Sequence, residues 1–388
     1  SSGRLYPEAI RTYAGQNGFE PFIIHVHSVG APTKEFTATW HPERFDFDIP
    51  NRNVHETAAI IQSVLREKGA TLKGIITGSE GDGVMLSAEL SQILGKDHNI
   101  PVGNVEPGLR NKQLMGDQVR AAGINSIPQL MSNDAEEIIQ WVRENQFLEK
   151  DGKVVIKLVE SACSEGLNIC TSEDQIRNAV RNSIGKRNEF GVINTHVLAQ
   201  KFIAGDEYAV NVVTAVNPST GEPHVVNTDI WKYNKRSSDR GSELIYWYDE
   251  LVLPNDPVVQ PLYNYAKEVL EAFHLRTGSA HAEIKMVPGL GPVLIEVGAR
   301  AMGAQQPAFV KHIVGQSQIE LGILSLWNPT QYSAEPVTYK PQHESAIVYT
   351  MKTKNPGSIY AANAAKIIES VPGFYKHRFF HGATAPLP

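Results

Sequence analysis

The chain has 388 residues, more than one hydrophobic core normally organises, so two or three domains are expected. Its composition, 41% hydrophobic and 20% charged, is that of an ordinary globular protein, and no apolar run approaches the roughly 18 residues that span a bilayer. A formal net charge of -6 provides no basic footprint for nucleic acid. The only cysteines, Cys163 and Cys170, favour a reducing compartment. We therefore expect a cytoplasmic protein that binds neither nucleic acid nor a membrane.

The first third of the chain alternates short apolar runs with segments of helical spacing. Pro21–His27 and Leu72–Thr77 are the apolar runs, whereas His55–Lys68 and Met85–Leu94 place apolar residues on one helical face. Alternation of strand and helix favours a parallel sheet covered by helices. The fold class expected for residues 1–125 is therefore a Rossmann-like α/β domain.

A glycine-rich loop, Gly78–Gly83, joins the second predicted strand to the helix that follows. Open α/β sheets usually meet ligands at this position, and Glu80 and Asp82 are candidates to bind the ammonium group of a substrate. A plain turn that needs glycine for its backbone explains the same composition.

Residues 126–206 show a pattern of strands with helices on one side, which predicts a small α+β lid domain. Asn133 with Glu136, and Ser172 with Gln175, are placed to cap the two helices. The predicted strands are Ile127–Leu130, Val154–Val159 and Leu167–Cys170.

Residues 207–388 contain longer alternating runs and predict a larger antiparallel α+β domain. The predicted strands are Tyr208–Val216, Pro223–Asp229, His281–Val287 and Val293–Val297.

The most informative of these runs flank the turn Pro288–Gly291, and together they predict a β-hairpin. If those four residues form the loop, Glu283 and Glu296 lie opposite each other on one face, with Cβ atoms roughly 5 Å apart. Facing carboxylates repel each other, and a divalent cation between them would remove that cost. Hard oxygen ligands suit Mg²⁺, so the pair predicts a magnesium site.

Less specific interpretations of the same hairpin remain open. The two carboxylates can be a solvated pair whose charge Lys285 offsets, and a slip of one residue in register would separate them. Arg300, four residues beyond Glu296, is placed to clamp phosphate or to stabilise a developing oxyanion. A surface ion pair with one of the glutamates is the alternative for this arginine.

A second cluster surrounds Lys157, which lies mid-strand among apolar residues, where an unpaired ammonium group is costly. The following loop, Ser161–Gly166, is small and polar, so its backbone amides can wrap around phosphate, although the Walker spacing is absent. A hairpin turn with an outward-pointing lysine is the alternative. No histidine is tied to Cys163 by a local signature, so we expect no nucleophilic role for this cysteine.

A third cluster, Leu198–Val210, combines a strand, a tight link and a second strand. Such a bend can offer backbone groups to a flat base, and Glu207 can accept hydrogen bonds from ribose hydroxyl groups. The pattern is common, so in isolation it indicates little.

Together and in this order, the clusters resemble the ATP-grasp superfamily, and within it the branch of L-amino-acid ligases that make dipeptides. The similarity extends from about Gly74 to Gly303. It implies that ATP and Mg²⁺ are held between two α+β domains, and that an amine attacks a carboxyl phosphate. Glu283 and Glu296 are then metal ligands, which act in catalysis together with Arg300. The implied ATP-binding residues are Lys112, Lys157, Ser161, Ser164, Glu165, Gly166, Gln200, Lys201, Phe202, Ile203 and Glu207.

Three departures from the family pattern stand out. Gln200 replaces the commoner glutamate of the adenine-binding hinge, and Gly298 stands where many relatives carry a metal-binding asparagine. Relatives also continue beyond the position that matches Phe379, so we expect a carboxy-terminal subdomain that is either shortened or partly missing from the given sequence.

Substrate specificity is less clearly encoded. Thr228–Gly241 combines aromatic and basic residues, and its polar half is long enough for a mobile lid, or for a solvated basic loop. Trp231, Tyr246 and Trp247 suit a core or a pocket wall equally well. The candidate substrate-binding residues are Glu80, Trp231, Lys232, His281 and Gly303.

We therefore expect an ATP- and Mg²⁺-dependent ligase that joins small amino acids through an amide bond and releases ADP and phosphate. Its partners would be small-molecule carboxylates and amines, and a homodimer is left open. A small-molecule kinase of the same fold and a nucleotide sensor without turnover are the two alternatives.

Overall fold

The computed structural model describes residues 5–28, 46–51, 53–78, 82–96, 111–161, 165–188, 191–237, 244–303, 306–343, 346–349 and 366–376. By their contacts, Ser1–Ile347 form one compact unit and Val348–Pro388 a second. The described part of the second unit contains one short helix, at residues 366–369. The three-domain division expected from the sequence stays a prediction.

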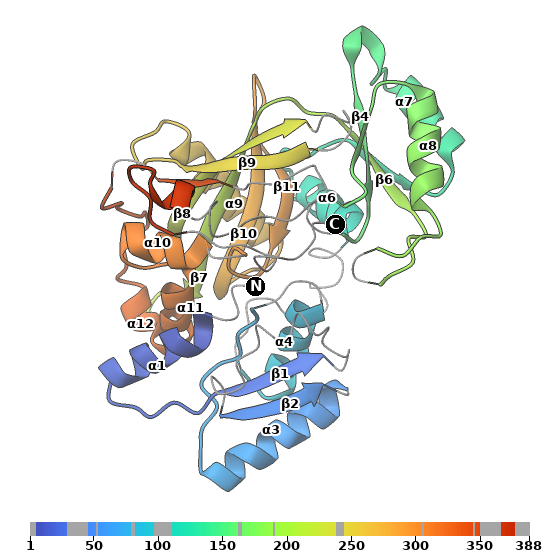
Figure 1. The fold of residues 1–388 in the computed structure, drawn as a ribbon. Coiled ribbons are helices and arrows are strands. Elements are labelled where there is room, and N and C mark those ends of the chain that lie inside the picture. Colours follow the sequence, from blue (N-terminus) through green and yellow to red (C-terminus); the bar gives the residue numbers. More distant parts are fainter. Residues whose placement is uncertain are drawn as a thin grey trace. The chain divides into compact units, whose positions relative to one another are not determined.

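The amino-terminal part contains the expected parallel strands, but the second of them lies elsewhere in the chain. Strand β1 (Ile24–Ser28) pairs in parallel with β2 (Phe47–Asn51), and residues 71–78 form no strand. The prediction of a strand at Leu72–Thr77 is therefore wrong. Ile75 packs instead as irregular chain into a small core of β1, α3 (Val54–Lys68) and α4 (Asp82–Ile93) (Figure 1).

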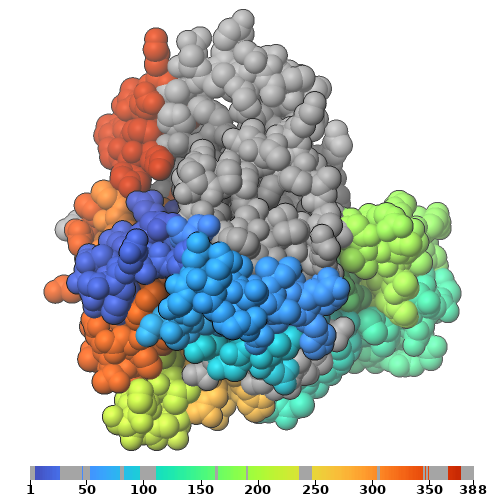
Figure 2. All heavy atoms as spheres, turned by 90° about the horizontal axis from the view of Figure 1, so that it is seen from below, coloured from blue at the N-terminus to red at the C-terminus, as the bar shows by residue number. Residues whose placement is uncertain are grey.

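Helix α1 (Tyr6–Gln16) packs on helix α11 (Gln318–Trp327), more than 300 positions later in the chain. Tyr6 and Ala9 share a buried cluster with Ile319 and Ile323 of α11. Figure 2 shows the blue atoms of the amino-terminal helix beside orange atoms from the later part of the chain. The first helix is therefore part of the core that supports the large sheet described below.

A four-stranded antiparallel sheet occupies the middle of the chain, in the order β3-β6-β4-β5, and includes strands at the three predicted places. Helices α7 and α8 pack on it and bury Ile138, Ile156 and Ile176. Ser172 caps α8 through the amide of Gln175 as predicted, but Asp134 rather than Asn133 caps α7. The elements are β3 (Gln129–Ser132), α7 (Ala135–Glu144), β4 (Val154–Leu158), β5 (Asn168–Cys170), α8 (Glu173–Ser183) and β6 (Val197–Lys201).

A six-stranded sheet follows, in the order β11-β10-β7-β8-β9-β12, and its pairings from β11 to β9 are antiparallel, as predicted (Figure 1). Helix α9 packs across β11, β10, β7 and β8, whereas α11 packs on β7 and β10. The elements are β7 (Asp206–Val216), β8 (Pro223–Ser237), β9 (Leu244–Leu251), α9 (Val259–Ala272), β10 (Gly278–Val287), β11 (Gly291–Gly298) and β12 (Ile347–Tyr349).

Strand β8 is longer than expected and extends into the segment Thr228–Gly241, whose polar half is predicted from the sequence to be a mobile lid or a solvated basic loop. The strand continues to Ser237 and pairs with β9, a strand that the sequence pattern did not predict. A bulge between Asn234 and Lys235 shifts the pairing by one residue, so simple alternation does not reveal the strand. Residues 238–243 of the predicted loop lie outside the described residues.

Three further helices complete the described part of the larger unit. Helix α6 (Lys112–Ala121) begins at Asn111, whose side chain accepts hydrogen bonds from the amides of Gln113 and Leu114. The other two are α10 (Gln306–Val314) and α12 (Pro329–Tyr332). None of the helices in the described ranges combines the length and the hydropathy needed to cross a membrane.

Candidate functional site

One face of the six-stranded sheet carries most of the candidate side chains. Strands β7 and β10 pair without interruption, with His281 opposite Asn211 and Lys285 opposite Glu207, so alternate residues share a face. Helix α11 covers the apolar end of this face, where Val213 is buried. Beyond that end the face becomes polar. Its polar positions are Glu296, Glu283, His281, Lys285, Glu207, Asn211, Asp229, Tyr233 and Asp249.

Glu283 and Glu296 are directly paired across β10 and β11, which confirms the predicted register of the two carboxylates. The hairpin reaches this register by a different route, because Val287 faces Gly291 and the turn is one residue shorter than expected. A β-bulge at Ile295 then adds one residue to β11, and the two differences cancel. Both glutamates therefore lie on the same face of the sheet.

Two lysines from outside this sheet approach the carboxylate pair. The Nζ atom of Lys112, at the start of α6, lies 3.4 Å from Oε1 of Glu296, and it also donates a hydrogen bond to the carbonyl of Ser161. Lys157 on β4 is 7% exposed. Burial and the neighbouring Lys112 lower the pKa of Lys157 to about 8, although Glu296 and Glu283 act in the opposite direction. The structure thus places two ammonium groups beside two carboxylates.

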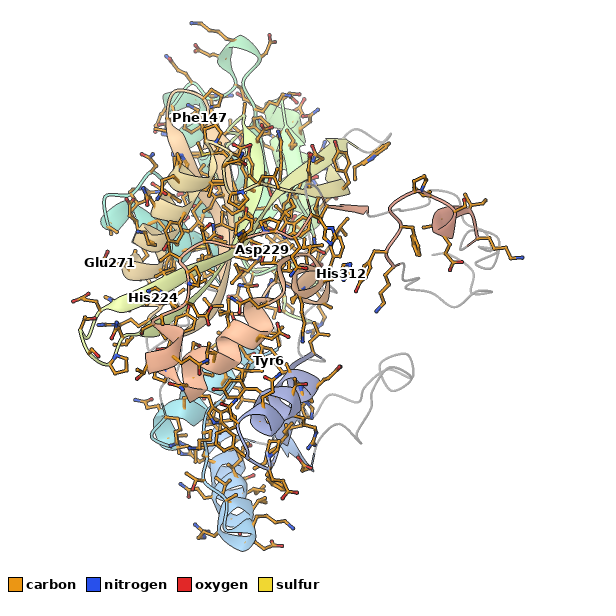
Figure 3. All side chains as sticks on the ribbon, turned by 90° about the vertical axis from the view of Figure 1, so that its left-hand side faces the viewer. Tyr6, Phe147, His224, Asp229, Glu271 and His312 are labelled. Carbon is orange, nitrogen blue, oxygen red and sulfur yellow. The ribbon has the colours of Figure 1, made fainter. Side chains whose placement is uncertain are left out.

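A buried hydrogen-bond chain supports Glu283 from behind. The Asn211 amide donates to Asp229, a residue labelled in Figure 3, and the Asn211 Oδ1 atom lies 2.8 Å from Nδ1 of His281. Nε2 of His281 lies 3.8 Å from Oε1 of Glu283. Burial opposes ionisation of Glu283, but His281 and Lys235 outweigh it and hold the pKa of this carboxyl below its usual range. The chain therefore fixes the imidazole ring and favours an ionised Glu283.

Two of the predicted substrate-binding residues, Trp231 and Lys232, are neighbours on β8 and differ in burial and in the face they occupy. Trp231 is fully buried, stacks near Phe309 and donates its indole N–H to Asp229 at 2.7 Å, so it supports the site without an exposed surface for ligand. Lys232 projects to the opposite face of β8, because neighbouring strand residues alternate, and it pairs with Asp206 at 2.7 Å. Trp231 thus lies on the face of the glutamate pair but is buried, whereas Lys232 lies on the other face, and their roles as substrate-binding residues stay predictions.

The predicted adenine-binding hinge is the link from β6 to β7. At Gly205 the backbone has φ of +147°, and a Cβ atom there would lie 2.2 Å from the carbonyl oxygen of Met286, so only glycine fits. Two cations approach the Phe202 ring, with Lys153 Nζ 5.5 Å and Lys285 Nζ 5.2 Å from its centre. Lys285 also donates to the carbonyl of Ile203 at 3.1 Å. The hinge is thus held firmly against β10.

The other residues of the hinge region differ in accessibility. Gln200 is buried and donates to Gln129 at 2.9 Å, whereas the side chain of Lys201 is exposed and lies over the ring of Phe147. Glu207 is also nearly buried, and its Oε1 atom lies 2.5 Å from Nζ of Lys235. Burial lowers the pKa of Lys235, but Glu207 and Glu283 outweigh this effect and raise it. Glu207 therefore already has a strong cationic partner.

Arg300 lies just beyond the end of β11 and is largely buried. Burial lowers the pKa of this guanidinium group to about 10, and Tyr6 partly offsets the effect. Its Nη1 atom donates to the carbonyl of Ala301 at 2.9 Å, and its side chain lies along Gly298, where a Cβ atom would be 3.6 Å from Cγ of Arg300. The guanidinium group is therefore largely withdrawn from solvent, and its role in the reaction stays a prediction.

The predicted phosphate loop is described only at its two ends. The Ser161 hydroxyl donates to the carbonyl of Glu165 at 3.5 Å, and Gly166 has φ of +67°, which favours glycine. Ser164, Cys163 and Glu80 lie outside the described residues. Gly303 is described and has no neighbouring atom within 4 Å of its Cβ direction.

The donor set can be tested against the implied Mg²⁺. Across the described ranges, no three or more His, Cys, Asp or Glu side chains are arranged to hold a metal ion by themselves. Glu283 and Glu296 offer carboxylate oxygens from two paired positions. Mg²⁺ is usually bound by one or two carboxylates together with the phosphates of a nucleotide. The pair therefore fits Mg²⁺ that enters with a nucleotide.

Comparisons with known proteins show sequence similarity to one family and to one characterised relative. Residues 151–307 match the family described as ATP-grasp domain. The chain is 29% identical over 308 residues to dapdiamide A synthase of Enterobacter agglomerans, a match that covers 77% of this chain and 68% of that protein.

The fold also matches solved structures. An L-amino acid ligase from Bacillus licheniformis aligns with a TM-score of 0.66 at 16% identity, over 93% of this chain and 82% of that one. An N5-carboxyaminoimidazole synthetase from Staphylococcus aureus, solved with ADP, aligns with a TM-score of 0.62 at 10% identity, over 90% and 79% of the two chains. At these identities the structural matches show a shared fold.

Proposed function

We propose that the chain belongs to the ATP-grasp superfamily, in its branch of ATP-dependent carboxylate–amine ligases, and that it joins two small amino acids through an acyl phosphate. The observation that carries the proposal is the paired Glu283 and Glu296 with the ammonium groups of Lys112 and Lys157 beside them. A cluster of this kind can stabilise the negative charge that shifts when the terminal phosphoryl group of ATP is transferred.

In the proposed reaction, Lys112 and Lys157 offset the negative charge of the ATP phosphates, and the hinge at Phe202 and Ile203 holds the base. Mg²⁺ on Glu283 and Glu296 would supply charge neutralisation between the phosphate oxygens. The substrate carboxylate attacks the γ-phosphorus atom, and the bond from that phosphorus to the β–γ bridging oxygen breaks, which releases ADP. A cationic, dehydrated environment favours this step, and both lysines are buried.

The amine then attacks the acyl carbon of the acyl phosphate, and the oxygen of the former carboxylate develops negative charge. We assign stabilisation of this oxyanion to Arg300, because its guanidinium group follows directly on the strand that carries Glu296. Collapse of the tetrahedral species breaks the carbon–oxygen bond to phosphate. The nitrogen gives up one proton to the departing phosphate, and the amide remains.

A phosphate-release screen tests the proposal. All pairs of the common L-amino acids are incubated with ATP and Mg²⁺, and the pair that releases most phosphate is analysed for ADP and for a condensed product. One ADP and one phosphate are expected for each amide. AMP with pyrophosphate would contradict an acyl phosphate, because it indicates an adenylate.

Hydroxylamine provides a second arm, since this small nucleophile should replace the amine. We expect a hydroxamate that depends on the carboxylate substrate, with one ADP for each molecule, and a lower yield from Arg300→Ala. A stable phosphorylated product would identify a kinase instead. ATP binding without turnover across the screen would identify a nucleotide sensor.

A further inference from the structure

Asp249 is a buried carboxylate on β9 that none of the proposed reaction steps uses. It faces Tyr233 on β8, in the same row of the sheet as Glu207 and Lys285, so it lies on the face that carries the glutamate pair. Lys235, Glu283 and His281 all influence its ionisation, which places the carboxyl group in the electrostatic environment of the reaction site.

Among the described residues, few hydrogen-bond donors stabilise the Asp249 carboxylate. The residue is 8% exposed, and its Oδ2 atom accepts only a long hydrogen bond of 3.5 Å from the amide of Gln306. Its Oδ1 atom is buried and finds no hydrogen-bond donor in the described part of the chain. An ionised carboxylate with an unsatisfied oxygen is costly in a protein interior, so a bound donor or cation would stabilise it.

The neighbouring charges indicate what that donor is. Glu207 has Lys235 as its partner, and Glu296 has Lys112. Glu283 lies beside His281 and forms the carboxylate pair with Glu296. Asp249 repels phosphate and has no cation of its own within salt-bridge distance among the described side chains. In a site whose other groups suit a polyphosphate, this leaves a place for a positively charged ligand.

We propose that Asp249 binds the ammonium group of the amine substrate and so places it on the sheet face that carries Glu283. This inference rests on the proposed ligase function and adds a residue that selects the second substrate. The amino acid that supplies the nucleophile reaches the enzyme mainly with its amino group as an ammonium ion, which releases one proton to solvent before the nitrogen attacks. A buried carboxylate attracts that ammonium group and repels the phosphates of ATP.

The ionisation of Asp249 is consistent with this role. Burial raises the pKa of its carboxyl group to about 7, with a further contribution from Glu283, whereas Lys235 and His281 lower it. A bound ammonium ion would favour the charged form and reverse the effect of burial. We therefore expect the pKa of Asp249 to fall when the amine binds.

The test compares wild type with Asp249→Asn, which removes the charge and keeps the shape, and with Asp249→Ala as a second variant. Glu250→Gln is the matched control, because Glu250 is the exposed neighbour on β9. Assays at pH 8 use the amino-acid pair with the greatest phosphate release, and parallel assays use hydroxylamine, which is uncharged at this pH. Thermal unfolding checks that each variant is folded.

We expect kcat/KM for the amine to fall by roughly 10- to 100-fold in both Asp249 variants, the loss typical of a hydrogen bond to a charged group. The KM for ATP and the yield of hydroxamate should stay within about threefold of wild type, since neither depends on contact between Asp249 and an ammonium ion. Glu250→Gln should behave as wild type.

Three results would overturn the proposal. Wild-type kinetics with the amine would show that Asp249 does not contact it. An equal loss of activity with hydroxylamine would show that Asp249 supports the reaction without recognising the positive charge of the amine. A higher Mg²⁺ concentration required by the Asp249 variants would indicate that the residue is a metal ligand. Failure of the ligase proposal is distinguishable, because it would appear as absent turnover in wild type.

Discussion

The ammonium group of Lys112 lies 3.4 Å from Glu296, although the two residues are separated by almost half of the chain. The contact joins the first turn of α6 to β11, and the same Nζ atom reaches the carbonyl of Ser161 at the start of the predicted phosphate loop. One cation therefore links three segments of the site. Because an exchange of partners costs less than exposure of a bare charge, phosphate oxygens can replace Glu296 as its counter-ion.

The paired glutamates lead to the first prediction. Glu283→Gln and Glu296→Gln should each lower turnover at least ~100-fold, the loss expected when a charge-stabilising group is removed. Folding should survive, because relief of repulsion between facing carboxylates costs the ATP-free protein little. Steady-state ADP formation and thermal unfolding measure the two effects. Near-normal turnover in both variants would rule out a metal-binding role, and Glu250→Gln serves as the exposed control.

The second prediction concerns the nucleotide. Glu207→Ala should weaken ATP binding by roughly 1.5–3 kcal/mol, since hydrogen bonds from ribose to a charged acceptor would be lost. Isothermal titration calorimetry provides the measurement, and Glu222→Ala, in the exposed turn before β8, is the control. The variant should also be less stable, because Lys235 would remain buried without its partner. An unchanged affinity for ATP would place Glu207 outside the nucleotide site.

The third prediction uses the lowered pKa of Lys157. Its pKa is about 8 in the folded protein against an ordinary value of 10.5, so between these pH values the unfolded chain binds more protons. The contribution of Lys157 to the free energy of unfolding should therefore increase between these two pH values, by roughly 3 kcal/mol at 1.36 kcal/mol per pKa unit.

Urea unfolding of wild type and Lys157→Met at pH 7.5 and pH 10 measures this effect, because other titrating groups are common to both proteins. The variant should be the more stable of the two at pH 7.5 and should lose most of that advantage at pH 10. A stability difference that does not change with pH would show that Lys157 titrates normally. The variant should also lack activity, since the lysine offsets phosphate charge in the proposed reaction.

The fourth prediction concerns the hydrogen-bond chain behind Glu283. Asn211→Ala removes the partner of His281 and one donor to Asp229, and should destabilise the fold by about 1–3 kcal/mol. It should lower kcat with little change in the KM for ATP, because the hinge at Phe202 is untouched. A rise in the KM for ATP without loss of kcat would instead connect this asparagine with nucleotide binding.

Much of the fold was predictable because its signals are local. The hairpin of β10 and β11, the cap at Ser172 and the β6–β7 link each depend on residues that are close in sequence. Strand β2 was missed because Pro50 and polar neighbours obscure its alternation, and β9 because it is bulged against β8.

The residues of the candidate site also differ in how far their positions could be predicted from the sequence. Glu283 and Glu296 were found by counting along one hairpin, whereas Asp249, Asn211 and Asp229 take part only through the order of strands in the sheet. Strand order is a long-range property that hydrophobic alternation does not specify. For Trp231 the sequence leaves a core position and a pocket wall equally open, and the structure buries the side chain.

The bulge at Ile295 has a consequence for the detection of such sites in other genomes. Without this residue, Leu294 and Glu296 would be consecutive and would still face Ile284 and Glu283 in an unbroken ladder. A gene that lacks this one codon would encode twelve positions from one glutamate to the other instead of thirteen (283 to 296), with the same two carboxylates opposed. A motif search that fixes the spacing would therefore discard genuine relatives, whereas a search that allows one extra residue within the second strand would retain them.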